Sequence, residues 1–195
     1  MIYKKYIKSY LDWIIAFFAI IILTPIFIIT IIMIRLDSKG AAFFLQNRLG
    51  KKGKLFKIIK FRSMTVDQDT KNFKTHKNDP RITKVGNFIR KTSIDELPQL
   101  FNIIKGDMSF IGPRPPLPHI PKEYKEYTNF ERKRFNVKPG ISGLAAIKQR
   151  EVHDWNLNIP LDVEYVENYS FIYDAKLFLS SLFAFFNTDN IYTKK

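Results

Sequence analysis

The longest apolar stretch of the chain runs from Trp13 to Ile34 and is interrupted only by Thr24, Pro25 and Thr30. At about 1.5 Å per residue, a straight helix of this length would just cross a hydrocarbon core of roughly 30 Å. Apolar side chains would occupy every face of that helix, which argues against burial inside a soluble protein. The stretch is too long for the apolar part of a signal peptide, and no small-residue cleavage site follows it. We therefore expect it to remain attached and to insert into the membrane.

Pro25 lies close to the middle of this stretch, where it bends a helix because it frees the carbonyl of Ile21. The hydroxyl of Thr24 can bond the carbonyl of Ile20 and reinforce the bend. Positive charge marks the cytoplasmic flanks of membrane segments. Both flanks are basic here, with Lys4, Lys5 and Lys8 before the stretch and Arg35, Lys39, Arg48, Lys51, Lys52 and Lys54 after it. We therefore predict a re-entrant helix–break–helix hairpin over residues 1–36 and one cytoplasmic, membrane-associated domain over residues 37–195.

Shorter elements follow from the rest of the pattern. The basic, glycine-punctuated segment Gln46 to Lys54 predicts a hairpin turn, and Leu55 to Met64 fits either a strand or a short amphipathic helix. Residues 66–79 are polar and aperiodic, as in a loop, and Pro139 to Gly143 is typical of a turn. The apolar run Leu177 to Phe186 is too short to span a bilayer. It either packs in the core or lies in the headgroup plane, and we favour the second.

These elements predict an α+β fold that is mainly helical. It would combine the re-entrant membrane hairpin with a small β-hairpin and with amphipathic helices at the membrane interface. The central stretch of this fold is Thr92 to Pro115, whose apolar residues recur at helical spacing, namely Leu97, Leu100, Phe101, Ile103 and Ile104. Pro98 suits only the first turn of a helix, so the helix is predicted to start near Asp95 and to end at Gly106.

Two adjacent carboxylates, Asp95 and Glu96, would then lie at the start of this helix. Free backbone N–H groups and the positive end of the helix dipole form an anion site there. A purely structural interpretation is also open, because Ser93 and Glu96 match a capping box in which each satisfies a free N–H group. Pro98 counts slightly against the capping box, since it would fall at the fifth helical position and remove a hydrogen bond.

The charge balance points to an anionic partner. The chain has 32 Lys and Arg against 18 Asp and Glu, a formal net charge of +14, which suits nucleic acid, an acidic membrane surface or a phosphorylated substrate. Arg114 stands between Pro113 and Pro115, which stiffen the backbone around a guanidinium suited to phosphate or carboxylate. The sequence contains no cysteine, which excludes disulfides and thiolate metal sites.

Together, and in this order, the motifs of the chain closely resemble those of the bacterial sugar transferase family, the small monotopic polyprenol-phosphate phosphoglycosyl transferases. The resemblance begins with the apolar run broken at Pro25 and continues through six segments, namely Lys60–Met64, Asp79–Thr83, Arg90–Leu100, Gly106–Pro115, Pro139–Gly143 and Tyr165–Asp174. It covers nearly the whole chain, and we expect none of the extra N-terminal spans that larger members carry. One of these motifs alone would be weak evidence, but the ordered set is highly specific.

The resemblance implies a reaction at the cytoplasmic face of the bacterial inner membrane. A sugar-1-phosphate would pass from a UDP-sugar to polyprenyl (undecaprenyl) phosphate, giving a polyprenyl diphosphate sugar and UMP in the first membrane step of glycan or glycoprotein assembly. The aspartate of the family's Asp-Glu dyad is a covalent nucleophile, a role that falls here to Asp95. Glu96 would help to position the metal or the incoming phosphate. A Mg²⁺ ion held by Asp95 and Glu96 would offset the charge of the diphosphate.

The resemblance also implies a set of substrate-binding residues within the matched motifs. They are Lys60, Arg62, Arg90, Gln99, Pro113, Arg114 and Pro115. The four cationic members of this set are candidates for holding the phosphates and the leaving UMP. Nucleic acid is not expected as a partner under this interpretation.

The chain departs from the family pattern at three positions. Thr24 replaces the serine that is usual before the membrane proline, but it keeps a hydroxyl for the bend. Gln149 stands where a glycine is expected, and Pro116 extends the proline arm. Both fall where sugar contacts could lie, so they bear on the identity of the donor more than on the chemistry.

Two other classes of function explain part of the pattern. A membrane-anchored, non-catalytic scaffold would account for the apolar stretch. A basic nucleic-acid-binding protein would account for the net charge. Neither class calls for an Asp-Glu pair beside an arginine motif, and we rank both far below the enzyme.

Overall fold

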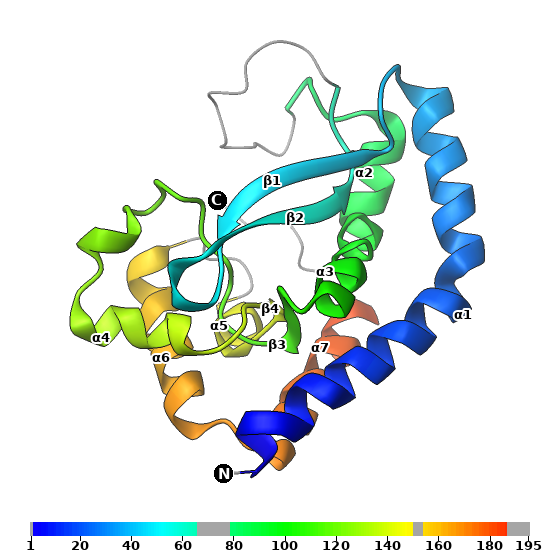
Figure 1. Ribbon diagram of the computed structural model, residues 1–195. Coiled ribbons are helices and arrows are strands. Elements are labelled where there is room, and N and C mark those ends of the chain that lie inside the picture. Colours follow the sequence, from blue (N-terminus) through cyan, green and yellow to red (C-terminus); the bar gives the residue numbers. More distant parts are fainter. Residues whose placement is uncertain (1, 66–78, 150–153, 187–195) are drawn as a thin grey trace.

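The computed structural model describes residues 2–65, 79–149 and 154–186. This part of the chain is mainly helical, with two small two-stranded sheets and a long apolar helix near its N-terminal end (Figure 1). The elements are η1 (Tyr3–Ile7), α1 (Lys8–Asp37), β1 (Phe43–Leu49), η2 (Lys51–Gly53), β2 (Leu55–Phe61), α2 (Lys84–Lys91), η3 (Ile94–Glu96), α3 (Gln99–Lys105), β3 (Ser109–Ile111), η4 (Tyr124–Glu126), α4 (Asn129–Arg132), η5 (Lys133–Asn136), β4 (Gly140–Ser142), α5 (Leu144–Lys148), α6 (Trp155–Asn168) and α7 (Phe171–Phe186). The predicted polar loop at residues 66–79 lies outside the described residues except for Asp79.

Helix α1 is a single helix that bends near its middle (Figure 1). Pro25 lies inside it, and the Thr24 hydroxyl donates a hydrogen bond of 2.8 Å to the carbonyl of Ile20, as predicted. The backbone stays helical across this region, so the predicted break takes the form of a bend within one helix. Together with η1, the helix is long and apolar enough to cross a membrane, by length and composition.

The two faces of α1 have different surroundings. Ala16, Phe27 and Ile34 are buried, the first against Leu100 and Ile103 of α3 and the other two in a cluster with Phe61 and Ile89. The opposite face is apolar but exposed, and its most exposed side chains include Phe18, Ile22 and Ile29. An apolar surface this large, left uncovered along a helix of this length, indicates a membrane location.

Buried polar contacts fix both ends of α1 to the rest of the protein. At the N-terminal end, Lys8 and the hydroxyl of Tyr3 both bond the carboxylate of Asp174 in α7. Close by, Ser109 of β3 donates a hydrogen bond to Asp12. At the C-terminal end, the guanidinium of Arg62 donates to the carbonyls of Lys39 and Ser38 at 2.6 and 2.7 Å. Both ends of the apolar helix are therefore attached to the same body of the protein.

Strands β1 and β2 form an antiparallel hairpin that runs from the pair Phe43–Phe61 to the pair Leu49–Leu55. Leu55–Met64, which fitted either a strand or a helix, is thus a strand as far as Phe61. The predicted turn was too long, because residues 46–49 belong to β1 and the chain reverses over residues 50–54. Since paired residues share a face of the ladder, Gln46 and Arg48 lie on the same face as Lys60.

Asn102 attaches α3 to the free edge of β2. Its side-chain carbonyl accepts a hydrogen bond from the Ile59 N–H at 3.0 Å, and its amide donates to the Lys57 carbonyl at 2.8 Å. The side chain is fully buried, so these bonds replace the water that would otherwise satisfy the strand edge. The turn that precedes α3 is thereby held beside the strand that carries Lys60.

Strands β3 and β4 form a short parallel pair, with Ser109 opposite Gly140 and Ile111 opposite Ser142. Residues 139–143, predicted as a turn, are therefore mainly a strand. The two backbones approach closely here, since a Cβ atom on Gly140 would lie 2.2 Å from the nitrogen of Gly112. Only glycine permits this contact, which places the segment after Gly112 directly beside β4.

Helix α7, which contains the apolar run Leu177–Phe186, is partly buried and partly exposed. Leu177 is buried in a cluster with Ile111, Leu144 and Tyr165, whereas Leu179, Leu182 and Phe183 are exposed. The helix therefore packs on the core with one face and presents apolar side chains with another. The side chains of residues 184–186 are outside the described part of the structure.

Candidate active site

The Asp-Glu dyad lies in a tight turn between α2 and α3. Ser93 has a positive φ of 51° and its side chain forms no capping hydrogen bond. After it come the short 3-10 helix η3 and Pro98, and α3 begins at Gln99. The predicted start of the α-helix near Asp95 is therefore wrong, and the capping box, which the sequence left open as an alternative, is not formed. The predicted end at Gly106 is confirmed, with a φ of 84°.

Glu96 lines a cavity of about 300 Å³ between the hairpin, α3 and the Pro-Arg-Pro segment. The other residues that line it are Arg48, Ile58, Lys60, Gln99, Arg114, Pro115, Gly140 and Ile141. Lys60 Nζ donates a hydrogen bond of 2.5 Å to Glu96 Oε1, and the side chain of Gln99 bonds the same carboxylate. The fold thus brings together five of the residues that the sequence singled out, although they come from three separate segments.

The two carboxylates of the dyad differ in their electrostatics. Burial alone would raise the pKa of Glu96, but the charges of Lys60 and Arg114 and the bonds from Lys60 and Gln99 outweigh it, so this pKa lies below its usual range. For Asp95, burial dominates and raises the pKa to about 6, although Lys60 and Arg90 oppose the shift. Glu96 is therefore ionised beside Lys60, whereas Asp95 changes between its protonated and ionised forms near pH 6.

Arg48 is a residue of this site that the sequence interpretation placed among the basic flanks of the membrane segment. It lines the cavity, and its guanidinium donates hydrogen bonds to the Pro115 carbonyl at 3.1 Å and to the Gln46 side chain at 2.7 Å. Desolvation, together with the nearby charge of Arg114, lowers its pKa to about 10. Residues two apart in a strand point to the same face. The spacing of Gln46 and Arg48 could therefore have predicted that both lie on the face of a strand that borders the cavity.

Arg62 and Arg90 occupy different positions from the cavity-lining cations. Arg62 is buried, and its guanidinium binds the carbonyls at the C-terminal end of α1. The structure therefore does not bring it to the dyad and gives it a role in holding the membrane helix. Arg90, at the end of α2, lies close enough to Asp95 to lower the pKa of that carboxyl.

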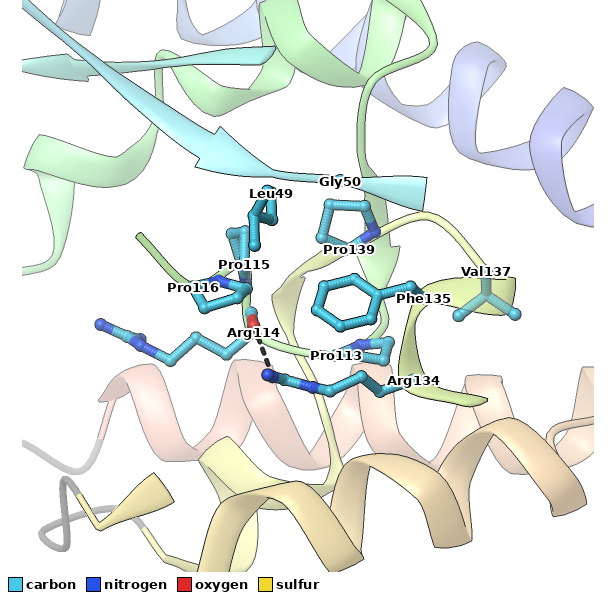
Figure 2. Close-up of a pocket in the computed structure, with 10 residues that line it drawn as sticks. All are labelled: Leu49, Gly50, Pro113, Arg114, Pro115, Pro116, Arg134, Phe135, Val137 and Pro139. Atoms are coloured by element: carbon cyan, nitrogen blue, oxygen red, sulfur yellow. Dashed lines mark hydrogen bonds between the residues drawn. The ribbon is translucent and has the colours of Figure 1, made fainter. Parts of the chain in front are cut away.

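The Pro-Arg-Pro segment forms the wall between two cavities. Arg114 and Pro115 line the cavity of the dyad, and both also line a smaller cavity of about 180 Å³, shown in Figure 2. Pro113 lines the smaller cavity and not the larger one. Figure 2 shows the Arg114 side chain extending away from Arg134, whose guanidinium bonds the Arg114 carbonyl at 2.8 Å.

The carboxylates of the site fit a hard divalent cation that takes its remaining ligands from a phosphorylated substrate. Within the described residues, no group of three or more acidic, histidine or cysteine side chains could hold a metal ion. Mg²⁺, however, commonly takes only one or two carboxylates and completes its shell with water and phosphate oxygens. The adjacent carboxylates of Asp95 and Glu96 meet that requirement, since they lie beside a cavity lined by cations suited to phosphates.

Comparison with known proteins places this geometry in a family. The model of the bacterial sugar transferase family matches residues 3–188. The galactosyl transferase CpsE of Streptococcus agalactiae is 42% identical over an alignment of 188 positions that covers 90% of this chain and 41% of that protein. The uncharacterized sugar transferase EpsL of Bacillus subtilis is 42% identical over 172 residues, which are 88% of this chain and 83% of EpsL.

A Klebsiella pneumoniae protein named UDP-glucose:undecaprenyl-phosphate glucose-1-phosphate transferase is 37% identical over 93% of this chain and 40% of its own length. The chain thus spans about two fifths of the Streptococcus and Klebsiella proteins and most of EpsL. The family match includes α1, the dyad and the Pro-Arg-Pro segment. The chain belongs to the bacterial sugar transferase family.

Proposed function

We propose that the protein transfers a sugar-1-phosphate from a UDP-sugar to polyprenyl (undecaprenyl) phosphate, giving a polyprenyl diphosphate sugar and UMP. The observation that carries this proposal is the cavity in which Glu96 meets Lys60, Arg48 and Arg114, with Asp95 beside it. Cationic side chains at one cavity suit a diphosphate, and the acidic pair supplies a nucleophile. The names of relatives from Klebsiella pneumoniae, Escherichia coli and Aeromonas hydrophila, which specify undecaprenyl phosphate as acceptor, support it.

The first half of the proposed reaction uses Asp95 as the nucleophile. A carboxylate oxygen of Asp95 attacks the sugar-bearing phosphorus, the bond from that phosphorus to the bridging oxygen breaks, and UMP leaves with the bonding electrons. Lys60, Arg48 and Arg114, which line the cavity, would hold the two phosphates and stabilise the charge that develops on UMP. The product is an acyl phosphate that joins Asp95 to the sugar-1-phosphate.

The second half of the reaction regenerates the enzyme. A phosphate oxygen of the polyprenyl phosphate attacks the same phosphorus, and the bond to the Asp95 oxygen breaks to release the free carboxylate. Glu96 is held ionised by Lys60, so it is unsuited to act as an acid and suited to orient a cation or the incoming phosphate. We assign it that orienting role.

A Mg²⁺ ion would be held by Asp95 and Glu96 together with phosphate oxygens of the donor. When bound, it would neutralise part of the diphosphate charge that otherwise repels an attacking carboxylate. In this arrangement Lys60 limits the negative charge of the dyad before donor and cation arrive. Chelation with EDTA should abolish UMP release, and added Mg²⁺ should restore it.

The attachment of both ends of α1 supports the re-entrant arrangement over residues 1–36. Lys8 reaches Asp174 of α7 at 2.7 Å, and the C-terminal end of α1 is held by Arg62. A straight span would place one of these ends, together with the residues that it contacts, on the far side of the bilayer. We therefore propose that both ends lie at the cytoplasmic face of the inner membrane, with residues 37–195 as the catalytic domain. The exposed side of α7 would rest at the interface.

The test of the proposed function is UMP release from a panel of UDP-sugars, with undecaprenyl phosphate and Mg²⁺ present. The native protein should release UMP with at least one donor, and Asp95→Asn should be at least about a thousandfold slower. Asp107→Asn is the matched control, because Asp107 lies on the same stretch but follows α3, whereas the dyad precedes that helix. Intact-mass measurement without acceptor should show one sugar phosphate added to the native protein and none to Asp95→Asn.

The same experiment separates the competing functions. A non-catalytic scaffold would release no UMP from any donor. A nucleic-acid-binding protein would instead bind DNA or RNA with a steep dependence on salt. Equal release by the native protein and by Asp95→Asn would exclude Asp95 as the nucleophile.

A further inference from the structure

Four consecutive carbonyls around Arg114 each accept a hydrogen bond from a residue distant in sequence. The Pro113 carbonyl accepts from Gly140 N at 3.0 Å, and that of Pro116 accepts from Leu49 N at 2.9 Å. The Pro115 carbonyl accepts from Arg48 at 3.1 Å, and that of Arg114 accepts from Arg134 at 2.8 Å. A segment without internal secondary structure is therefore fixed from several sides, while its one charged side chain remains exposed at the cavity.

The bond from Arg134 belongs to a buried ion pair. Arg134 Nη2 lies 2.5 Å from Asp162 Oδ2, and the side chains of both residues are at least 98% buried. Asp162 also accepts a hydrogen bond from the Arg114 backbone N–H. The pair therefore binds both the N–H and the carbonyl of Arg114, which fixes the orientation of its peptide groups and hence the direction in which its side chain leaves the backbone.

Stability alone is a weak explanation for this pair. Removing two charges from water costs several kcal/mol, which mutual attraction often fails to recover, and a well-packed apolar pair can serve equally well. Arg134 Nε and Nη1 also lack a hydrogen-bond partner in the described part of the structure, although the guanidinium lies over the rings of Phe135 and Trp155. What an apolar pair could not supply is the hydrogen bonding to the backbone of Arg114.

We propose that Arg134 and Asp162 are positioning residues that act through Arg114, holding its guanidinium at the cavity of the dyad for the phosphates of the UDP-sugar. This proposal rests on the proposed function, since it assigns the pair to the donor side of that reaction. It makes a specific claim about kinetics. Loss of the pair should impair use of the UDP-sugar and leave use of polyprenyl phosphate nearly unchanged.

The test replaces the pair by apolar residues of similar size, Arg134→Met with Asp162→Leu. We expect cooperative thermal unfolding at a somewhat lower temperature than that of the native protein, because the ion pair is removed as a whole but the N–H and carbonyl of Arg114 lose their partners. The KM for the UDP-sugar should rise about tenfold to a hundredfold, the range expected when a binding group is misplaced by about 1 Å. The KM for undecaprenyl phosphate should stay within about twofold.

A second arm asks whether the effect passes through Arg114. In an Arg114→Ala background, the same double replacement should raise the KM for the UDP-sugar little further, because the side chain that the pair positions is already absent. Lys133→Gln with Glu167→Gln is the matched control. That pair joins the same elements, η5 and α6, at 2.6 Å, but it is half-exposed and does not touch Arg114, so kinetics should not change.

Two outcomes would overturn the proposal. One is native kinetics in a folded Arg134→Met/Asp162→Leu protein. The other is a rise in the KM for the UDP-sugar that is as large in the Arg114→Ala background as in the native protein. If the double variant does not fold, Arg134→Lys applies the same criteria, since it keeps a charge beside Asp162 and removes the planar guanidinium that bonds the Arg114 carbonyl.

Binding of UDP in the presence of Mg²⁺ keeps this proposal distinct from the proposed function. Should the native protein release no UMP from any donor, the proposed function fails, yet the effect of the pair can still be read as a change in UDP affinity. An equal UDP affinity in the native and Arg134→Met/Asp162→Leu proteins would count against the positioning role.

Discussion

At the scale of single residues, Asp95 sets the pH dependence of the proposed reaction. A carboxylate attacks only when ionised, and burial raises the pKa of Asp95 to about 6. The ionised fraction is therefore lost as the pH falls through about 6, and not near the usual value of 3.8. Because kcat/KM reports the free enzyme, we expect kcat/KM for the UDP-sugar to be constant above pH 7 and to fall about tenfold per pH unit below pH 6.

Lys60 provides the control for this assignment. Its charge lowers the pKa of Asp95, so Lys60→Met should move the midpoint of the pH profile upward. A profile that stays flat to pH 5, or a midpoint unchanged by Lys60→Met, would contradict the role given to Asp95.

Arg48 is expected to contribute directly to donor binding. Arg48→Met removes a charge from the cavity and a hydrogen bond to the Pro115 carbonyl. A hydrogen bond to a charged group is worth about 1.5–3 kcal/mol, so kcat/KM for the UDP-sugar should fall about tenfold to a hundredfold. Lys57→Met, on the opposite face of the same hairpin, should be close to native. Equal losses in both variants would indicate a general effect of net charge.

The sequence predicted single residues best where a motif carried them. Glu96, Lys60, Gln99 and Arg114, which the motifs singled out, line one cavity. Arg62 was assigned to phosphate binding because it lies two residues from Lys60 in the same motif. Position along a strand does not reveal that one side chain faces the cavity while its neighbour reaches the end of a helix. Arg48 was missed because its segment was predicted as a turn.

At the scale of elements, the contact between β3 and β4 determines where the Pro-Arg-Pro segment begins. Gly140→Ala would place a methyl group 2.2 Å from the nitrogen of Gly112, and relief requires the two strands to separate. We expect a loss of about 1–3 kcal/mol in the free energy of unfolding, measured by chemical denaturation, together with reduced UMP release. Gly106→Asn is the matched control, because asparagine tolerates its positive φ and a Cβ there meets only the end of Lys138. A stable, active Gly140→Ala protein would refute this role.

The prediction of elements failed where pairing is not local. β4 is only three residues long and its partner β3 lies about thirty residues earlier, so no local pattern marks it. The hairpin, by contrast, was found through its glycine-rich turn. The start of α3 was misplaced because the positive φ of Ser93 redirects the chain, a tertiary effect that apolar spacing does not register.

At the scale of the whole molecule, the re-entrant arrangement makes a topological prediction. The chain has no cysteine, so single cysteines placed at Ile2 and Lys39 report without background. Both should resist a membrane-impermeant maleimide in intact cells and react after the inner membrane is made permeable. Labelling of Ile2→Cys alone in intact cells would show a straight span. The apolar stretch, its bend and its basic flanks were evident in the sequence, whereas the packing of α1 on the rest of the protein was not.

The shared packing of α1 has a practical consequence for handling the protein. Ala16, Phe27 and Ile34 fill the same clusters as Ile58, Phe61 and Leu100, so the two proposed parts of the chain, residues 1–36 and 37–195, are not independently stable units. A shortened protein that begins after the membrane segment would expose the underside of the hairpin and α3, and it should aggregate instead of becoming soluble. Inhibitor screening and structure determination should therefore keep the full chain in nanodiscs or a similar lipid mimetic.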